Sequence, residues 1–298
     1  MKIKVASFLI LFAFSLKAQV PVQNVPPPEN PNVALSHDEH DEDDTLSSMH
    51  HHVYHVNPWV TGTITAAGTI YSLAMLPVLQ SKPQITSAEF QTLNPGLIRG
   101  FDSWVLHQSV GNLKQLENYS IYTQFTAALV PLTIFFDKTI SHDWGDVLLI
   151  FMEVNAIDAT IYMSPLGPVF QNKYRPLAYY TNLPEDQRNS GGTRNSFYSG
   201  HVAAAAADMF SMAKVYCDYH PEASKVLTYG LASIPPIVMT YFRIKALDHF
   251  PSDLFIGWVV GTCVGVGVPE LHRVADKNLS FGPYINPGGT GISMAWHP

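Results

Sequence analysis

Residues 250–269 read FPSDLFIGWVVGTCVGVGVP, and this stretch decides the fold class of the chain. From 254 to 269 it contains no charged residue, so it is long and apolar enough for a helix in a protein core or a membrane. Gly257, Gly261 and Gly265 recur every four residues within it. Glycine in a helix interior costs about 1 kcal/mol relative to alanine. The spacing therefore indicates close packing against the backbone of a second helix.

Five further apolar segments extend this pattern along the chain. Three of them lack Asp, Glu, Lys and Arg, and two contain acids. They are 56–81, 118–136 and 226–242, and then 147–163 with Glu153 and Asp158 and 197–213 with Asp208. Together the segments predict an all-α bundle of about six core helices. The tail has a turn-like stretch from Asn286 to Gly289 between two rough alternations, which predicts a small C-terminal β-hairpin.

The first 55 residues differ from the rest. A basic start, an uncharged run over 5–16 and a small residue at Ala18 predict an export signal peptide over 1–19. Residues 20–55 hold a proline-rich segment and a tract of acids and histidines, which predict a disordered leader that binds metal weakly at most. We expect a helical domain over 56–273 and a tail over 274–298.

Composition excludes some classes of partner. The 298 residues include 17 Lys and Arg against 24 Asp and Glu, a net charge of −7, so no basic face is expected for nucleic acid. Hydrophobic residues make up 47% and charged residues 14%, against about 25% charged in an average soluble domain. The low charge is typical of a membrane-associated chain, although a soluble helical domain stays open.

The residues that can carry chemistry form three clusters. Arg175 and Arg243 carry guanidinium groups, which are suited to binding phosphate oxygens. A helix expected to start near Ser199 would offer unpaired backbone N–H groups to an anion. The spacing from His249 to Asp253 lets the carboxylate approach one imidazole nitrogen and leave the other free to attack. Taken alone, Ser199 could be only an N-cap. The clusters are Lys173-Tyr174-Arg175-Pro176, Ser199-Gly200-His201, and Arg243 with His249 and Asp253.

These clusters resemble the superfamily of type-2 phosphatidic-acid phosphatases, bacterial class A acid phosphatases and vanadium haloperoxidases. The family pattern is Lys-x6-Arg-Pro, then Pro-Ser-Gly-His, then Ser-Arg-x5-His-x3-Asp. The chain follows it from Arg175 to Asp253, over about the C-terminal half of the mature protein. It departs where Pro168 replaces the lysine, Tyr198 the proline and Phe242 the serine.

The resemblance implies a helical bundle of the phosphatase and haloperoxidase type and a metal-independent phosphatase. His249 would attack phosphorus to give a phosphohistidine, oriented by Asp253, and His201 would serve first as acid and then as base. The implied phosphate-binding groups are Arg175, Arg243, Ser199 and the backbone N–H of Gly200, with Lys173 in place of the missing lysine.

The implied substrate is lipid-linked, of the phosphatidic acid or isoprenoid diphosphate type, or else a small phosphoester. We expect no cofactor, although vanadate could occupy the site as a phosphate mimic. The expected location is the cell envelope, either in the membrane with the active site on the periplasmic side or soluble in the periplasm. The alternatives are a soluble periplasmic acid phosphatase of broad specificity, a vanadate-dependent haloperoxidase, and a catalytically weakened binding relative, which the loss of the lysine favours.

Five other side chains have two interpretations each. Glu153 and Asp158 are functional if they lie at membrane depth, and hydrogen-bonded polar residues otherwise. Asp248 either tunes the neighbouring histidine or is a solvated loop acid, which is the simpler interpretation. Cys217 and Cys263 either pair after export or are buried thiols.

Overall fold

The computed structural model describes residues 52–189, 191–274, 279–286 and 289–296. The expected signal peptide over 1–19 and all of the leader except residues 52–55 lie outside the described residues. In chain order, the elements are α1 (Pro58–Gln80), α2 (Ser87–Thr92), η2 (Pro95–Leu97), η3 (Gly100–His107), α3 (Leu113–Leu129), η4 (Val130–Phe136), α4 (Lys138–His142), α5 (Trp144–Met163), η5 (Pro176–Tyr179), α6 (Glu185–Arg188), η6 (Gly191–Arg194), α7 (Gly200–Tyr219), α8 (Lys225–Ala232), α9 (Ile234–Lys245), α10 (Pro251–His272), β1 (Leu279–Asn286) and β2 (Gly289–Trp296).

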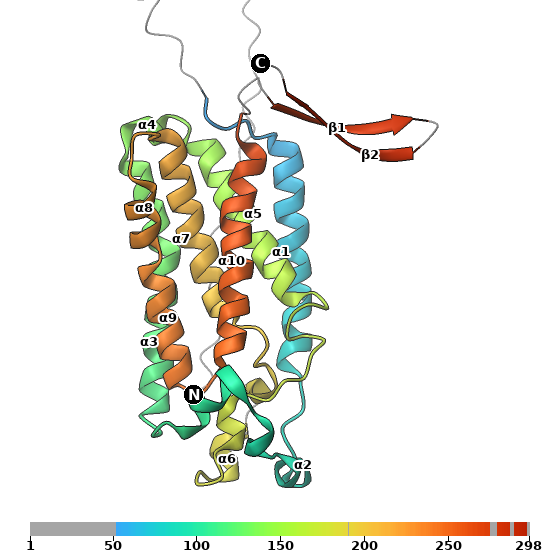
Figure 1. Ribbon diagram of the computed structural model, residues 1–298, viewed down its shortest axis with the longest axis vertical. Coiled ribbons are helices and arrows are strands. Elements are labelled where there is room, and N and C mark those ends of the chain that lie inside the picture. Colours follow the sequence, from blue (N-terminus) through green and yellow to red (C-terminus); the bar gives the residue numbers. More distant parts are fainter. Residues whose placement is uncertain (1–51, 190, 275–278, 287–288, 297–298) are drawn as a thin grey trace, which may run out of the picture. The chain divides into compact units, whose positions relative to one another are not determined.

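The expected all-α bundle is confirmed. In the part of the chain that the structure describes, six helices have 12 or more residues: α1, α3, α5, α7, α9 and α10. They run side by side (Figure 1), with α5 and α7 both packed against α10. Aliphatic side chains fill the space between these three helices, and Ile150, Val154 and Val215 are fully buried there.

The glycine steps of α10 lie against α7, as their spacing predicts. A Cβ on Gly257 would lie 2.6 Å from the carbonyl oxygen of Ser199, and one on Gly261 would lie 2.1 Å from that of Ala203. Gly265 makes the third such approach, at 2.5 Å from a backbone oxygen of α7. Larger side chains at these positions would force the two backbones apart, so the glycines set the separation of α7 and α10.

Three of the described helices are long and apolar enough to cross a membrane. Their outer faces carry large apolar side chains, among them Trp59, which is 85% exposed, and Ile70, which is 67% exposed. A surface of this kind is stable in contact with lipid and costly in water. The three segments are Pro58–Gln80, Leu113–Phe136 and Pro251–His272.

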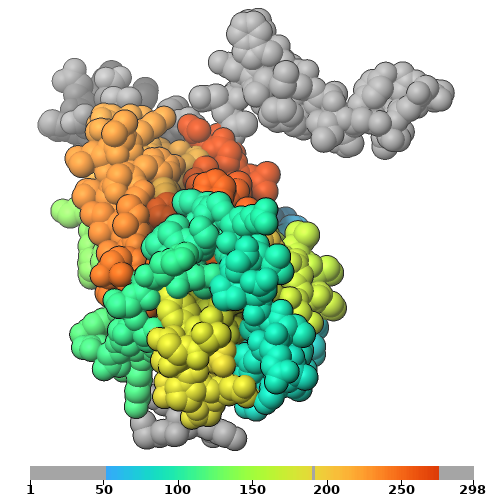
Figure 2. Space-filling view, turned by 60° about the horizontal axis from the view of Figure 1, so that its bottom comes forward, coloured from blue at the N-terminus to red at the C-terminus, as the bar shows by residue number. Residues whose placement is uncertain are grey.

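One end of the bundle is covered by η3 and by the segment from η5 to α6. Figure 2 looks onto this end and shows the two segments in teal and yellow. Val105 of η3 is fully buried and packs with Tyr180 and Leu247. The Asp102 carboxylate accepts hydrogen bonds from the backbone N–H of Ser252 at 2.9 Å and from its hydroxyl at 2.7 Å. η3 therefore caps the start of α10.

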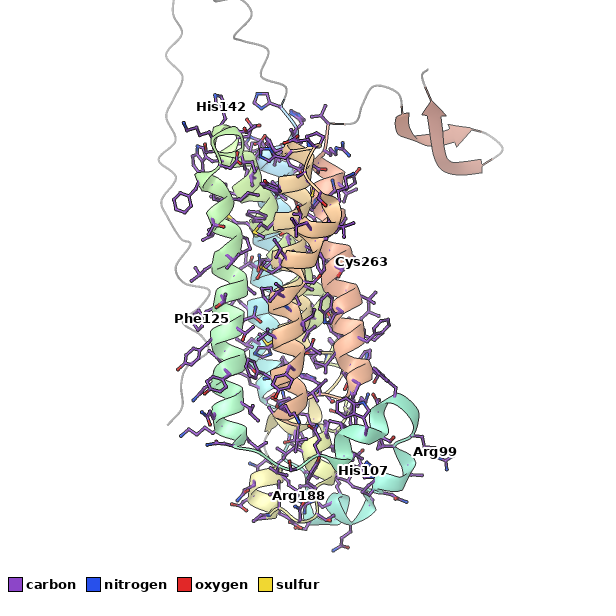
Figure 3. All side chains as sticks on the ribbon, turned by 60° about the vertical axis from the view of Figure 1, so that its left-hand side comes forward. Arg99, His107, Phe125, His142, Arg188 and Cys263 are labelled. Atoms are coloured by element: carbon purple, nitrogen blue, oxygen red, sulfur yellow. The ribbon has the colours of Figure 1, made fainter. Side chains whose placement is uncertain are left out.

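The tail and the cysteines were also anticipated in part. β1 and β2 pair antiparallel with Asn286 opposite Gly289, which is the expected hairpin, and residues 287–288 between the strands lie outside the described residues. Cys217 and Cys263 are both free, so of the two interpretations left open the disulfide between them is wrong. Cys217 is buried, as a thiol in a core would be, but Cys263 is exposed on the outer face of α10 (Figure 3).

Candidate active site

The start of α7 provides one side of the site. Ser199 is the N-cap residue, but its side chain makes no capping hydrogen bond, so the N-cap interpretation of its hydroxyl is not supported. The hydroxyl is fully buried and has no hydrogen-bond partner among the described residues. A Cβ on Gly200 would lie 2.7 Å from the ring of Tyr162, so only glycine fits there. The opening of α7 thus presents a buried, unpartnered donor beside backbone N–H groups that lack helical partners.

His249 lies between α9 and α10 and is 1% exposed. Its Nδ1 lies 2.6 Å from the backbone carbonyl oxygen of Ser196, which cannot donate, so Nδ1 carries the proton. Nε2 is then the unprotonated nitrogen, and it lies 3.4 Å from Nη2 of Arg243. The imidazole is held in the tautomer that a nucleophile requires.

Asp253 is not the direct partner of His249 that the spacing suggested. Its carboxylate accepts hydrogen bonds from the Ser196 hydroxyl at 2.5 Å and from the backbone N–H of Phe250 at 3.2 Å. The carboxylate turns back to cap its own helix because α10 begins at Pro251, which places Asp253 in the first turn. Ser196 therefore joins the two residues, with its hydroxyl on Asp253 and its carbonyl on His249.

Two arginines converge on Asp248. Nη1 of Arg175 donates to Oδ1 of Asp248 at 2.6 Å, and Nη1 of Arg243 lies 3.0 Å from Oδ2. Asp248 is buried, so its interpretation as a solvated loop acid is wrong. The Nε atoms of both arginines are buried and have no hydrogen-bond partner among the described residues. These atoms are donors available to an anion.

Lys173 joins the cluster through carboxylates. Its ammonium lies 2.7 Å from Asp253 and 3.8 Å from Asp102. A different lysine, Lys82, donates to the backbone carbonyl of Pro168, the position where the family pattern has its lysine. A direct contact of Lys173 with phosphate stays a prediction.

Burial and the arginines shift the pKa values of both histidines in the same direction. Desolvation first, and then the charges of Arg243 and Arg175, hold the pKa of His249 well below its usual range. The same causes in the same order lower the pKa of His201. A bound phosphate opposes the arginine charge, so it favours return of a proton to His201. The free site contains two neutral imidazoles at neutral pH.

The two remaining acids belong to the bundle. Glu153 lies 2.6 Å from Nε2 of His272 at the far end of α10, which fits the interpretation as a hydrogen-bonded residue. Asp158 is buried in α5, and its Oδ1 has no hydrogen-bond partner among the described residues. Among the described residues, no hydrogen bond or ion pair joins either acid to the histidines and arginines of the cluster.

One member of the cluster, Ser196, was missed by sequence reasoning, and the contacts of another, Asp248, were not predicted. Ser196 lies outside the three motifs, and nothing in its neighbourhood marks it. Asp248 was named only because it directly precedes His249, and its contacts with Arg175 and Arg243 had no signal in the sequence. The remaining predicted residues, from Arg175 to Asp253, are brought to the same end of the bundle by η5, α7, α9 and α10.

The cluster lies within a region that matches a known family. Residues 126–276 match the PAP2 superfamily, and this region contains all of the predicted site residues. The chain belongs to the PAP2 superfamily. Membership implies phosphatase-like activity on a phosphate ester. No curated protein and no solved structure matched the chain in the corresponding comparisons.

Proposed function

We propose that this protein is a metal-independent phosphatase that hydrolyses a lipid phosphomonoester or diphosphate through a phosphohistidine on His249. The observation that carries the proposal is the geometry of His249, whose Nδ1 is bound to a carbonyl while Nε2 lies beside Arg243. Nucleophile and electrostatic clamp are thus adjacent in a buried site, where charge stabilisation is strongest.

The reaction has two steps. In the first, Nε2 of His249 forms a bond to phosphorus while the bond to the leaving oxygen breaks, and His201 gives that oxygen a proton. In the second, His201 takes a proton from water, the water oxygen attacks phosphorus, and the bond to Nε2 breaks. Arg175 and Arg243 bind the equatorial oxygens as charge builds on them. Ser199 adds its buried hydroxyl, and Asp253 acts on His249 through Ser196.

An apolar groove on α10 supports a lipid substrate. It is an open hollow of about 500 Å³ with an almost wholly apolar lining. The groove lies on the exposed face of α10, the helix whose first turn holds Asp253, and its wall contacts α9 through a 2.9 Å hydrogen bond from Trp258 to Thr240. A hydrocarbon chain attached to the bound phosphate can follow it along the membrane helix. The lining residues are Phe255, Trp258, Val259, Thr262 and Cys263.

The apolar helices and the expected signal peptide also support a location for the protein. The three apolar helices support attachment to a membrane, and the signal expected over 1–19 supports export with the active site on the periplasmic side. Retention of the protein in membranes after an alkaline wash is the expected result. Release into the supernatant would favour the soluble acid phosphatase instead.

The test of the activity is phosphate release from phosphatidic acid, an isoprenoid diphosphate and a small aryl phosphate. We expect His249→Ala to lower the rate at least about 10³-fold, because no other group replaces the nucleophile. His142→Ala is the matched control, since His142 lies in α4 at the opposite end of the bundle (Figure 3). Equal rates for wild type and His249→Ala would refute the proposed function.

The test of the substrate class compares alkyl phosphates of short and long chain. Val259→Trp fills the groove, so it should raise KM for the long-chain ester about tenfold and leave KM for the short-chain ester within a factor of two. Leu271→Trp is the control, because Leu271 is 84% exposed on the same helix outside the groove. An equal effect of Val259→Trp on both esters would exclude the groove as the seat of the chain.

A further inference from the structure

The Asp248 carboxylate binds both arginines that the proposed function assigns to phosphate. One oxygen accepts from Arg175 at 2.6 Å, and the other lies 3.0 Å from Arg243. The side chain is only 12% exposed, so water screens these contacts weakly. Each guanidinium uses one Nη atom on Asp248, which leaves its Nε available. The Asp248 carboxylate thus lies between the guanidinium groups of Arg175 and Arg243.

The backbone around Asp248 holds it there. Leu247 has φ of 59°, a left-handed conformation that is unfavourable for a bulky residue. Its carbonyl accepts from the N–H of Leu177, two residues after Arg175, and the N–H of Asp248 donates to the carbonyl of Arg243 at 3.1 Å. The turn is therefore bound to both segments that carry the arginines. Strained residues of this kind concentrate at functional sites.

We propose that Asp248 is a positioning residue, an internal counter-anion that holds Arg175 and Arg243 in place and weakens their binding of inorganic phosphate. The inference rests on the proposed function, because it assumes that phosphate binds these arginines. A guanidinium group that a fixed carboxylate already holds in place needs no reorganisation when the substrate binds. The same negative charge repels the product, so inorganic phosphate leaves more readily.

The two effects can be separated by two substitutions. Asp248→Asn keeps the shape and one acceptor oxygen but removes the charge, so the inhibition constant of inorganic phosphate should fall about tenfold. Asp248→Ala removes the anchor as well, so KM should rise and kcat should fall. If Asp248 has only a structural role, both Asp248→Asn and Asp248→Ala should bind phosphate more weakly than wild type. For Asp248→Asn this is the opposite of the result that we expect.

The experiment measures binding of inorganic phosphate to the full-length protein by calorimetry, and its inhibition constant in the hydrolysis assay. Asp218→Asn is the matched control, because Asp218 pairs with Lys214 and Arg273 near the C-terminal end of α7, far from the site. We expect tighter binding in Asp248→Asn alone. Unchanged or weaker binding in that variant, with wild type still active, would overturn this inference and leave the phosphatase proposal intact. If inorganic phosphate binds neither wild type nor Asp248→Asn, and wild type hydrolyses no substrate, both this inference and the phosphatase proposal are overturned.

Discussion

Replacement of Gly257 by alanine tests how closely the activity depends on the contact of α7 and α10. The new Cβ would lie 2.6 Å from the carbonyl oxygen of Ser199, whereas an ordinary contact begins near 3.4 Å. The helices must therefore separate locally by about 0.8 Å, the difference between 3.4 and 2.6. Ser199 starts the helix that carries His201, and Gly257 lies one turn after Asp253.

A misplacement of about 1 Å between reacting groups costs on the order of 10²-fold in rate. We therefore expect Gly257→Ala to lower kcat/KM by roughly that factor. The free energy of unfolding should fall by up to about 2 kcal/mol, because overpacking costs about 1 to 3 kcal/mol and alanine recovers about 1 kcal/mol of helix propensity. The variant should stay folded, so its loss of activity reports geometry.

The assay is phosphate release combined with thermal unfolding. Gly267→Ala is the control, since Gly267 lies in the same helix and a Cβ there has no atom within 4 Å. It should keep the wild-type rate and gain up to about 1 kcal/mol in stability. If Gly257→Ala retains the activity of Gly267→Ala, the inferred dependence on the α7 to α10 contact is wrong.

Three further predictions concern the same site. Ser199→Ala should change the free energy of unfolding by less than about 0.5 kcal/mol, because the Ser199 hydroxyl has no hydrogen-bond partner among the described residues. It should nevertheless weaken phosphate binding. A loss of stability near 1 kcal/mol would instead identify Ser199 as a helix cap. The reaction requires neutral His249 and protonated His201, and burial and the arginines lower the pKa of both. The pH profile of kcat/KM should therefore peak below 6.5. A peak above neutrality would contradict the assignment. Orthovanadate should inhibit competitively and a chelator should leave the rate unchanged; loss of activity on chelation would identify a metal enzyme.

Much of the fold followed from local patterns. Long uncharged segments predicted the bundle, and the four-residue glycine period predicted the face of α10 that meets another helix. These features depend on residues close in sequence, where helical geometry determines which side chains share a face. The boundaries and the shorter 3₁₀ segments depend on packing and were not predicted.

The site was predicted in its members but not in its contacts. Arg175, His201 and Asp253 follow from motif spacing, because each stands at a helix start or just before one. The contact between Ser196 and His249 joins residues 53 positions apart, so no local pattern indicates it. Asp253 was misassigned because a four-residue spacing within a regular helix differs from the same spacing across a helix start.

The central claim is that His249 carries the phosphoryl group during turnover. The most direct measurement is alkaline quenching of the enzyme during hydrolysis of a substrate labelled in its phosphate, followed by identification of the labelled residue. The account predicts a base-stable, acid-labile phosphohistidine at His249 in wild type and no labelled protein in His249→Ala. Turnover without labelled protein, or label that persists in His249→Ala, would contradict it.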